Sequence, residues 1–267
     1  MLQKLRHRLD LILGSVPILA TLTVTASSSI AATFSSSSTN IFLSEFSSVP
    51  ANVGIIATPD LFLSSNGGSV DGSADFNPIF IENNPVASDS SFAFVEGEGQ
   101  GYTGTAKTDV SLIGNNFFVE AGSTFSFDFL AELELETFID NPGGENAIAQ
   151  SNISFFLFSS ENDTLLDFFS ISAQIETDEP GDFLSVQSSS NFTLLLDDSD
   201  GEFGENEEFI EAVYIGGFSR EFSEDTTLRL VAATTNHASV KAPEPNSVVA
   251  VLVFGVVGGV LRKRKSL

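Results

Sequence analysis

The strongest constraint on the fold of this chain is a two-residue hydrophobic repeat near its middle. Between residues 125 and 135, apolar side chains occupy every second position, and most of the positions between them are polar or acidic. Successive side chains of a β-strand point to opposite faces, whereas a helix would spread these residues around its circumference. The alternation therefore predicts a strand with one buried and one solvated face, although Ala, Glu and Leu favour helices.

Similar short apolar segments recur along the chain, and Gly, Pro, Asn and Asp residues separate them at 66–68, 141–144, 179–182 and 200–201. Such residues suit the turns between antiparallel strands. We therefore expect an all-β fold: a two-sheet antiparallel β-sandwich of the jelly-roll type, with Phe side chains between the sheets. The expected strands are 41–46, 52–56, 76–81, 92–95, 117–120, 125–135, 153–158, 165–175, 183–187, 192–196, 209–215 and 228–233. Residues 33–75, rich in Ser, Asn and Gly, are expected to form an edge region with irregular loops.

The segments of the C-terminus follow one another in the order typical of a sorting signal. A Pro-Glu-Pro motif precedes an apolar run at 248–261, which is followed by four cations. As a helix, this run would be about 21 Å long, against about 30 Å for a bilayer core. The cations would stay on the cytoplasmic side of the membrane. A buried core helix would not normally carry these flanks. The motif residues are Pro243, Glu244 and Pro245, and the basic cluster is Arg262, Lys263, Arg264 and Lys265.

This tail resembles the PEP-CTERM sorting signal of bacterial exported surface proteins. The resemblance implies recognition by an exosortase-type enzyme, a transient anchor in the inner membrane and a final place at the cell surface or in an exopolysaccharide matrix. Ala242 stands where the family often has a hydrophobic residue or Val, a minor departure. The resemblance covers the two ends of the chain only and does not assign the central part to a domain family.

The N-terminus reads as a secretory signal peptide. A basic start precedes an apolar segment at 11–24, and small residues follow it closely. We expect export by the Sec machinery and cleavage after Ala31, with cleavage after Ala32 or an uncleaved anchor as the alternatives. The expected division is thus a signal peptide at 1–31, an acidic Phe-rich β-sandwich domain at 32–241 and a sorting tail at 242–267.

The expected domain is strongly acidic. All but two of the 36 acidic residues, Asp10 and Glu244, fall within it, but only four of the 11 Lys and Arg residues do, so 34 acids face four bases. A net charge of about −30 repels nucleic acid and anionic lipid, and neither is an expected partner. Because the chain has no cysteine, its stability depends on the core and not on disulfides.

Few residues of this chain are of the types that usually act in catalysis. Once a signal peptide is removed, His237 is the only histidine, and no Gly-x-Ser-x-Gly motif presents a nucleophile. A zinc or copper site built on His or Cys needs more such ligands. Glycoside hydrolysis needs only two carboxylates, but sugar-stacking Trp is absent and Tyr occurs twice. We therefore expect no enzymatic activity.

Calcium is the ion that an acidic loop would favour, since it takes oxygen ligands from flexible segments. The candidate site is Asp197, Asp198, Asp200 and Glu202, in a carboxylate-rich stretch that departs from the EF-hand pattern. The alternative is a charged hairpin loop without an ion. A weaker candidate combines residues 161–163 with Asp167.

The sequence thus predicts a non-catalytic, exported surface or extracellular-matrix protein associated with exopolysaccharide or the envelope. The alternative is a carbohydrate-binding β-sandwich module, assisted by calcium in one version. A glycoside hydrolase is a distant third.

Overall fold

The computed structural model describes residues 32–140, 142, 144–177, 180–204 and 206–243. These residues form an all-β fold of antiparallel strands, as predicted. The strands are β1 (Ala32–Ser44), β2 (Asn52–Ser65), β3 (Ser69–Phe76), β4 (Ile79–Ile81), β5 (Val86–Glu98), β6 (Tyr102–Val119), β7 (Ser123–Ile139), β8 (Asn146–Ser159), β9 (Leu165–Glu176), β10 (Phe183–Ser188), β11 (Phe192–Glu202), β12 (Glu207–Phe222) and β13 (Thr226–Ala242).

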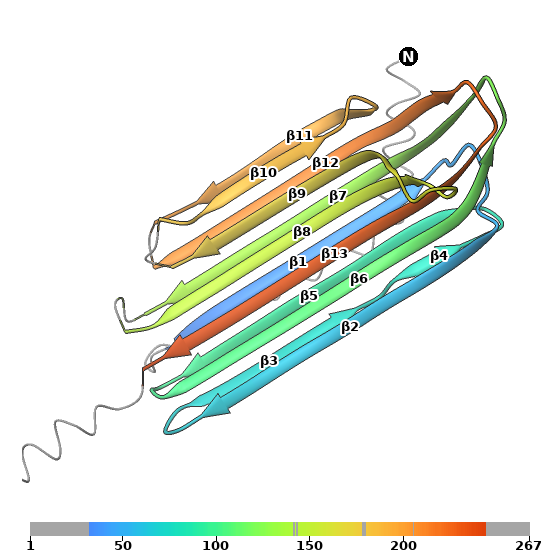
Figure 1. The fold of residues 1–267 in the computed structure, drawn as a ribbon. Coiled ribbons are helices and arrows are strands. Elements are labelled where there is room, and N and C mark those ends of the chain that lie inside the picture. The colour runs from blue at the N-terminus through green and yellow to red at the C-terminus, as the bar shows by residue number, and fades with distance from the viewer. Residues whose placement is uncertain (1–31, 141, 143, 178–179, 205, 244–267) are drawn as a thin grey trace, which may run out of the picture.

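The strands form two sheets that face each other (Figure 1). Sheet A has the order β11-β12-β7-β1-β5-β3, with β4 paired to β5, and sheet B has the order β10-β9-β8-β13-β6-β2. The first and last strands, β1 and β13, lie opposite each other in the middle of the two sheets. The two-sheet arrangement is as predicted, whereas the jelly-roll type of connection remains a prediction.

The predicted strand at 125–135 is the centre of β7, and its predicted inward residues are buried. Phe127 is 1% exposed, and its ring centroid lies 5.3 Å from that of Phe218 and 5.4 Å from that of Phe46. Further Phe rings from both sheets extend this cluster, as the two-residue repeat indicated. Aromatic packing of this kind fills the space between sheets with few side chains.

The expectation for residues 33–75 is wrong in part. β2 and β3 do lie at sheet edges, but β1 is a central strand of sheet A, paired with both β5 and β7. Its Ser and Thr residues at inward positions are buried in the strand and do not form irregular loops. They escape the cost of burial because they form hydrogen bonds inside the sandwich.

A polar layer crosses the interior and accounts for these buried hydroxyls. At its centre, the Asn236 side chain accepts a hydrogen bond from Ser37 Oγ (3.0 Å), and its Nδ2 donates to Thr39 Oγ1 (2.9 Å). Asp89, 1% exposed, accepts hydrogen bonds from Thr234 Oγ1 (2.6 Å) and Ser91 Oγ (2.9 Å). The layer separates the large Phe-rich cluster from a smaller one built on Ala, Val and Tyr102.

Both ends of the folded part lie at one end of the sandwich. Ala32 pairs with Glu98 and Ala242 with Tyr102, the residues on either side of the turn from β5 to β6. The Gly101 N–H donates to the carbonyl of Pro243 (2.9 Å). Among the described residues, no helix is long and apolar enough to cross a membrane. The segment at 248–261 predicted as a membrane helix lies outside those residues.

Candidate functional site: two chemically different outer faces

The acidic stretch predicted as a calcium-binding loop is mostly a strand. Asp197, Asp198, Asp200 and Glu202 lie in β11, which pairs with β12, and the turn between the two strands comes after Glu202. The loop assignment is therefore wrong, because the pairing with β12 outweighs the turn preference of Asp200-Gly201. Within the part of the chain that the structure describes, no group of three or more His, Cys, Asp or Glu side chains is arranged to hold a metal ion. Calcium binding by this segment remains a prediction.

The structure brings Asp198, Asp200 and Glu202 into a larger acidic face on the outside of sheet A, whereas Asp197 pairs with Tyr214, whose side chain is buried. Asp200 pairs with Glu211 of β12, and Glu211 pairs with Glu134 of β7, so three carboxylates lie side by side on adjacent strands. Like charges directly opposite each other destabilise a sheet. Burial raises the pKa of Glu134, and the charge of Glu211 raises it further. Burial also raises the pKa of Glu136, with added repulsion from neighbouring glutamates.

We expect the protein to become more stable as the pH falls from 7.5 to 5, because four carboxyls with a raised pKa outweigh His237, whose lowered pKa acts in the opposite direction. Burial is the main cause of a raised pKa at Asp89, Glu96, Glu134 and Glu136. A carboxyl whose folded pKa exceeds its unfolded value binds more protons in the folded state. Stability then falls as the pH rises from the unfolded value, near 4, through the folded value. Urea unfolding at constant ionic strength measures the free energy of unfolding across this range.

The double variant Glu134→Gln/Glu136→Gln is the control for this pH dependence. It removes two of the titrating groups, so its stability should change less between pH 5 and 7.5 than that of the parent protein. Equal or greater stability of the parent at pH 7.5 would contradict the expectation.

The outer face of sheet B differs sharply, because amide and hydroxyl side chains cover its centre. Gln174, Gln150 and His237 lie in register on β9, β8 and β13. Gln150 Nε2 donates to Gln174 Oε1 (2.7 Å), and Gln150 Oε1 lies 3.4 Å from His237 Nδ1. In the neighbouring row, Asn152 Nδ2 donates to Ser172 Oγ (2.7 Å). We call this hydrogen-bonded set the amide face.

A shallow groove of about 380 Å³ follows the amide face across the strands. Phe183 of β10, 43% exposed, lies at one end of the groove, and Lys107 of β6 lies at the other. Five successive strands thus contribute one residue each to a single row of the groove, in the order Phe183, Gln174, Gln150, His237 and Lys107. Four strand spacings give this row a length of about 19 Å.

The amide face is close to neutral in charge. Lys107 Nζ forms an ion pair with Asp109 Oδ2 at 2.7 Å. Burial lowers the pKa of His237, and the nearby charge of Lys107 lowers it further, so the imidazole is uncharged at pH 7. His237 lies well inside β13 and lines the groove.

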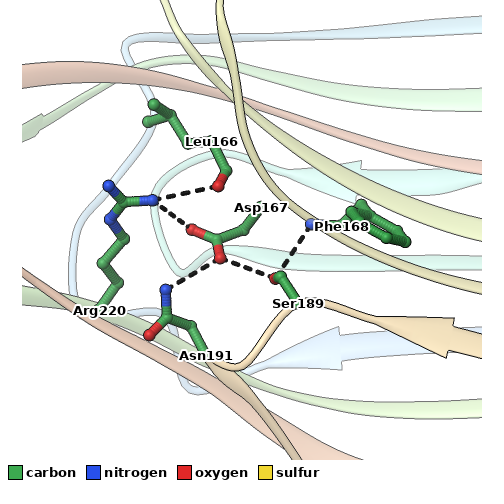
Figure 2. A network of polar contacts seen from close by, with 6 residues as sticks. All are labelled: Leu166, Asp167, Phe168, Ser189, Asn191 and Arg220. Atoms are coloured by element: carbon green, nitrogen blue, oxygen red, sulfur yellow. Dashed lines mark hydrogen bonds and ion pairs between the residues drawn. The ribbon is translucent and has the colours of Figure 1, made fainter.

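The weaker calcium candidate is divided between two ion pairs. Asp163 Oδ1 lies 3.1 Å from Arg229 Nη1, and Asp167 Oδ2 lies 2.7 Å from Arg220 Nη1. Figure 2 shows that Asp167 also accepts hydrogen bonds from Ser189 Oγ (2.7 Å) and Asn191 Nδ2 (2.9 Å). Because Asp167 belongs to sheet B and Arg220 to sheet A, this network joins the two sheets. Its geometry indicates a structural role.

Of the predicted sorting residues, the structure describes Pro243 alone, which is exposed directly after β13. Ala31, Glu244, Pro245 and the cations at 262–265 lie outside the described residues. No protein-family model, curated protein or solved structure matches this chain. The interpretation of its surface therefore depends on the chemistry of the two faces.

Sequence reasoning missed the amide face. The pairing of β8, β9 and β13 brings its residues together, and β6 and β10 complete the groove. A signal was present, since Gln150 and Asn152 of β8 are two residues apart and Ser172 and Gln174 of β9 are as well. Amide and hydroxyl residues at i and i+2 share one face of a strand.

Proposed function

We propose that this chain is a non-catalytic, exported protein of the cell surface or extracellular matrix, sorted by an exosortase-type system. The observation that carries the proposal is the position of the folded part. Its first strand begins at Ala32, directly after the predicted cleavage site, and its last strand ends at Ala242, directly before the Pro-Glu-Pro motif. All strands that the structure describes thus lie within residues 32–242, between the predicted cleavage site and the Pro-Glu-Pro motif.

Deletion of residues 243–267 should mislocalise the protein and leave the sandwich folded, because β13 ends at Ala242, before the deleted residues. In a cell that carries an exosortase, Glu244→Ala should block processing, which an immunoblot of cell and medium fractions detects. Glu224→Ala, in the turn between β12 and β13, is the matched control and should be processed normally. Loss of the β-sheet circular dichroism signal on deletion, or normal processing of Glu244→Ala, would refute the proposal.

A second function, carbohydrate binding by the sandwich, is favoured by the amide face. Amide and hydroxyl groups that are held in place on a rigid sheet suit the recognition of sugar hydroxyls. This function is compatible with the first, since a matrix protein that holds exopolysaccharide would need such a surface. A role for calcium in this binding is a further proposal, and the acidic face on sheet A is its candidate location.

A further inference from the structure

We propose that the groove on the amide face binds a neutral polysaccharide, which lies across the strands from Phe183 toward Lys107. This inference rests on the second proposed function and names its site and ligand class. Three features of the described residues support it: the hydrogen-bonding groups of the groove, its exposed aromatic ring and its charge.

The hydrogen-bonding groups of the groove match sugar hydroxyls. A primary amide offers two donors and an acceptor with two lone pairs, and a sugar hydroxyl both donates and accepts. Hydrogen bonds join Gln150 to Gln174 and Asn152 to Ser172, so these side chains are held in place before a ligand binds. Among the described residues, His237 Nε2 makes no hydrogen bond and remains available to the groove. Groups fixed before binding lose less entropy when a ligand arrives.

The exposed aromatic ring is that of Phe183. It lies on the edge strand β10 and lines the groove beside Ala173 and Gln174. An exposed aromatic ring at the end of a polar groove offers an apolar surface to the C–H face of a sugar ring, and the amides then bind the hydroxyls at its rim.

The charge of the site selects against acidic polysaccharides. The Lys107–Asp109 pair cancels, and His237 is uncharged at pH 7, so the groove offers no net positive charge. Around it, the domain carries a net charge of about −30. Such a field repels polyanions and leaves neutral chains unaffected.

The test is affinity electrophoresis of the full chain in mild detergent, through gels that contain a soluble neutral glucan, galactan, mannan or xylan. A polyuronate gel and a plain gel serve as references. At least one neutral polysaccharide should retard the protein. Gln150→Ala/Gln174→Ala and Phe183→Ala should each raise the dissociation constant about tenfold or more. A tenfold rise corresponds to a loss of about 1.4 kcal/mol of binding free energy.

Two matched variants control for general surface effects. Gln100→Ala, in the turn between β5 and β6, and Phe203→Ala, 47% exposed beyond β11, should bind like the parent protein. Retardation that survives all groove variants would refute this site and leave carbohydrate binding in place elsewhere. Absence of binding to every neutral polysaccharide, or binding to the polyuronate alone, would refute the ligand class. Neither result bears on export and sorting, which the processing assay tests separately.

Discussion

Phe127→Asp should abolish the stable fold of the protein at room temperature or reduce its stability severely. Phe127 is 1% exposed and packs against Phe218, Phe46 and Phe192 between the sheets. Truncation of a buried Phe to Ala typically costs about 3–5 kcal/mol, and an unpaired carboxylate at the same site adds its own cost of burial. This approaches the whole stability of an ordinary domain. Thermal unfolding followed by circular dichroism measures the effect.

Ser126→Asp is the matched control, since it introduces the same charge one residue earlier, where the side chain points to the outer face. Its melting temperature should fall far less. Phe127→Leu keeps an apolar side chain and should remain folded. Equal losses in Phe127→Asp and Ser126→Asp would mean that the two faces of β7 are wrongly assigned.

Arg220→Met should lower the free energy of unfolding by about 3 kcal/mol, because it leaves the carboxylate of Asp167 buried without its cation. The Asp167 side chain is 2% exposed and the Arg220 side chain is 32% exposed. Because Arg220 is partly solvated, we expect a loss at the lower end of the range of about 3–5 kcal/mol for breaking a buried ion pair. The Arg220 guanidinium also donates to the Leu166 carbonyl (3.2 Å), so the variant loses contacts to two neighbouring residues of β9 (Figure 2). Urea unfolding measures the loss.

The double variant Arg220→Met/Asp167→Asn separates charge burial from packing. Asn at position 167 retains an acceptor for Ser189 and removes the unpaired charge. The double variant should therefore recover part of the stability that Arg220→Met loses. If the two substitutions were additive and the double variant were less stable than either single variant, the ion pair would not determine the effect.

The sequence predicted the strands that carry large apolar side chains at their inward positions. It missed the full length of the strands that carry small or polar side chains there. In β7, Phe and Leu occupy all inward positions of 125–135 except that of Ala131, and the predicted faces are correct. In β1, Ser35, Ser37 and Thr39 occupy the inward positions and carry no hydrophobic signal. Their partners, such as Asn236, lie almost 200 residues away in the chain. A pattern read along one segment does not contain such partners.

The same limit applies to the surface. Proximity along the chain suggested that Asp197 to Glu202 form a compact loop, but the strand separates Asp198 from Asp200 by about 6.6 Å along β11. The amide face arises in the opposite way, from residues of five strands between Lys107 and His237. The spacing within one strand shows which polar residues share a face, but only the sheet order shows which strands bring them together.

The central place of β13 has a mechanical consequence. β13 is hydrogen-bonded along its length to β6 on one side and β8 on the other, and the chain leaves it at Pro243. Hydrogen bonds of an antiparallel ladder lie perpendicular to the strands. A force that pulls Pro243 along the strand axis, while the rest of the sandwich is held, therefore loads all hydrogen bonds of both ladders in shear. It does not break them one after another. The domain is thus built to resist tension at this end.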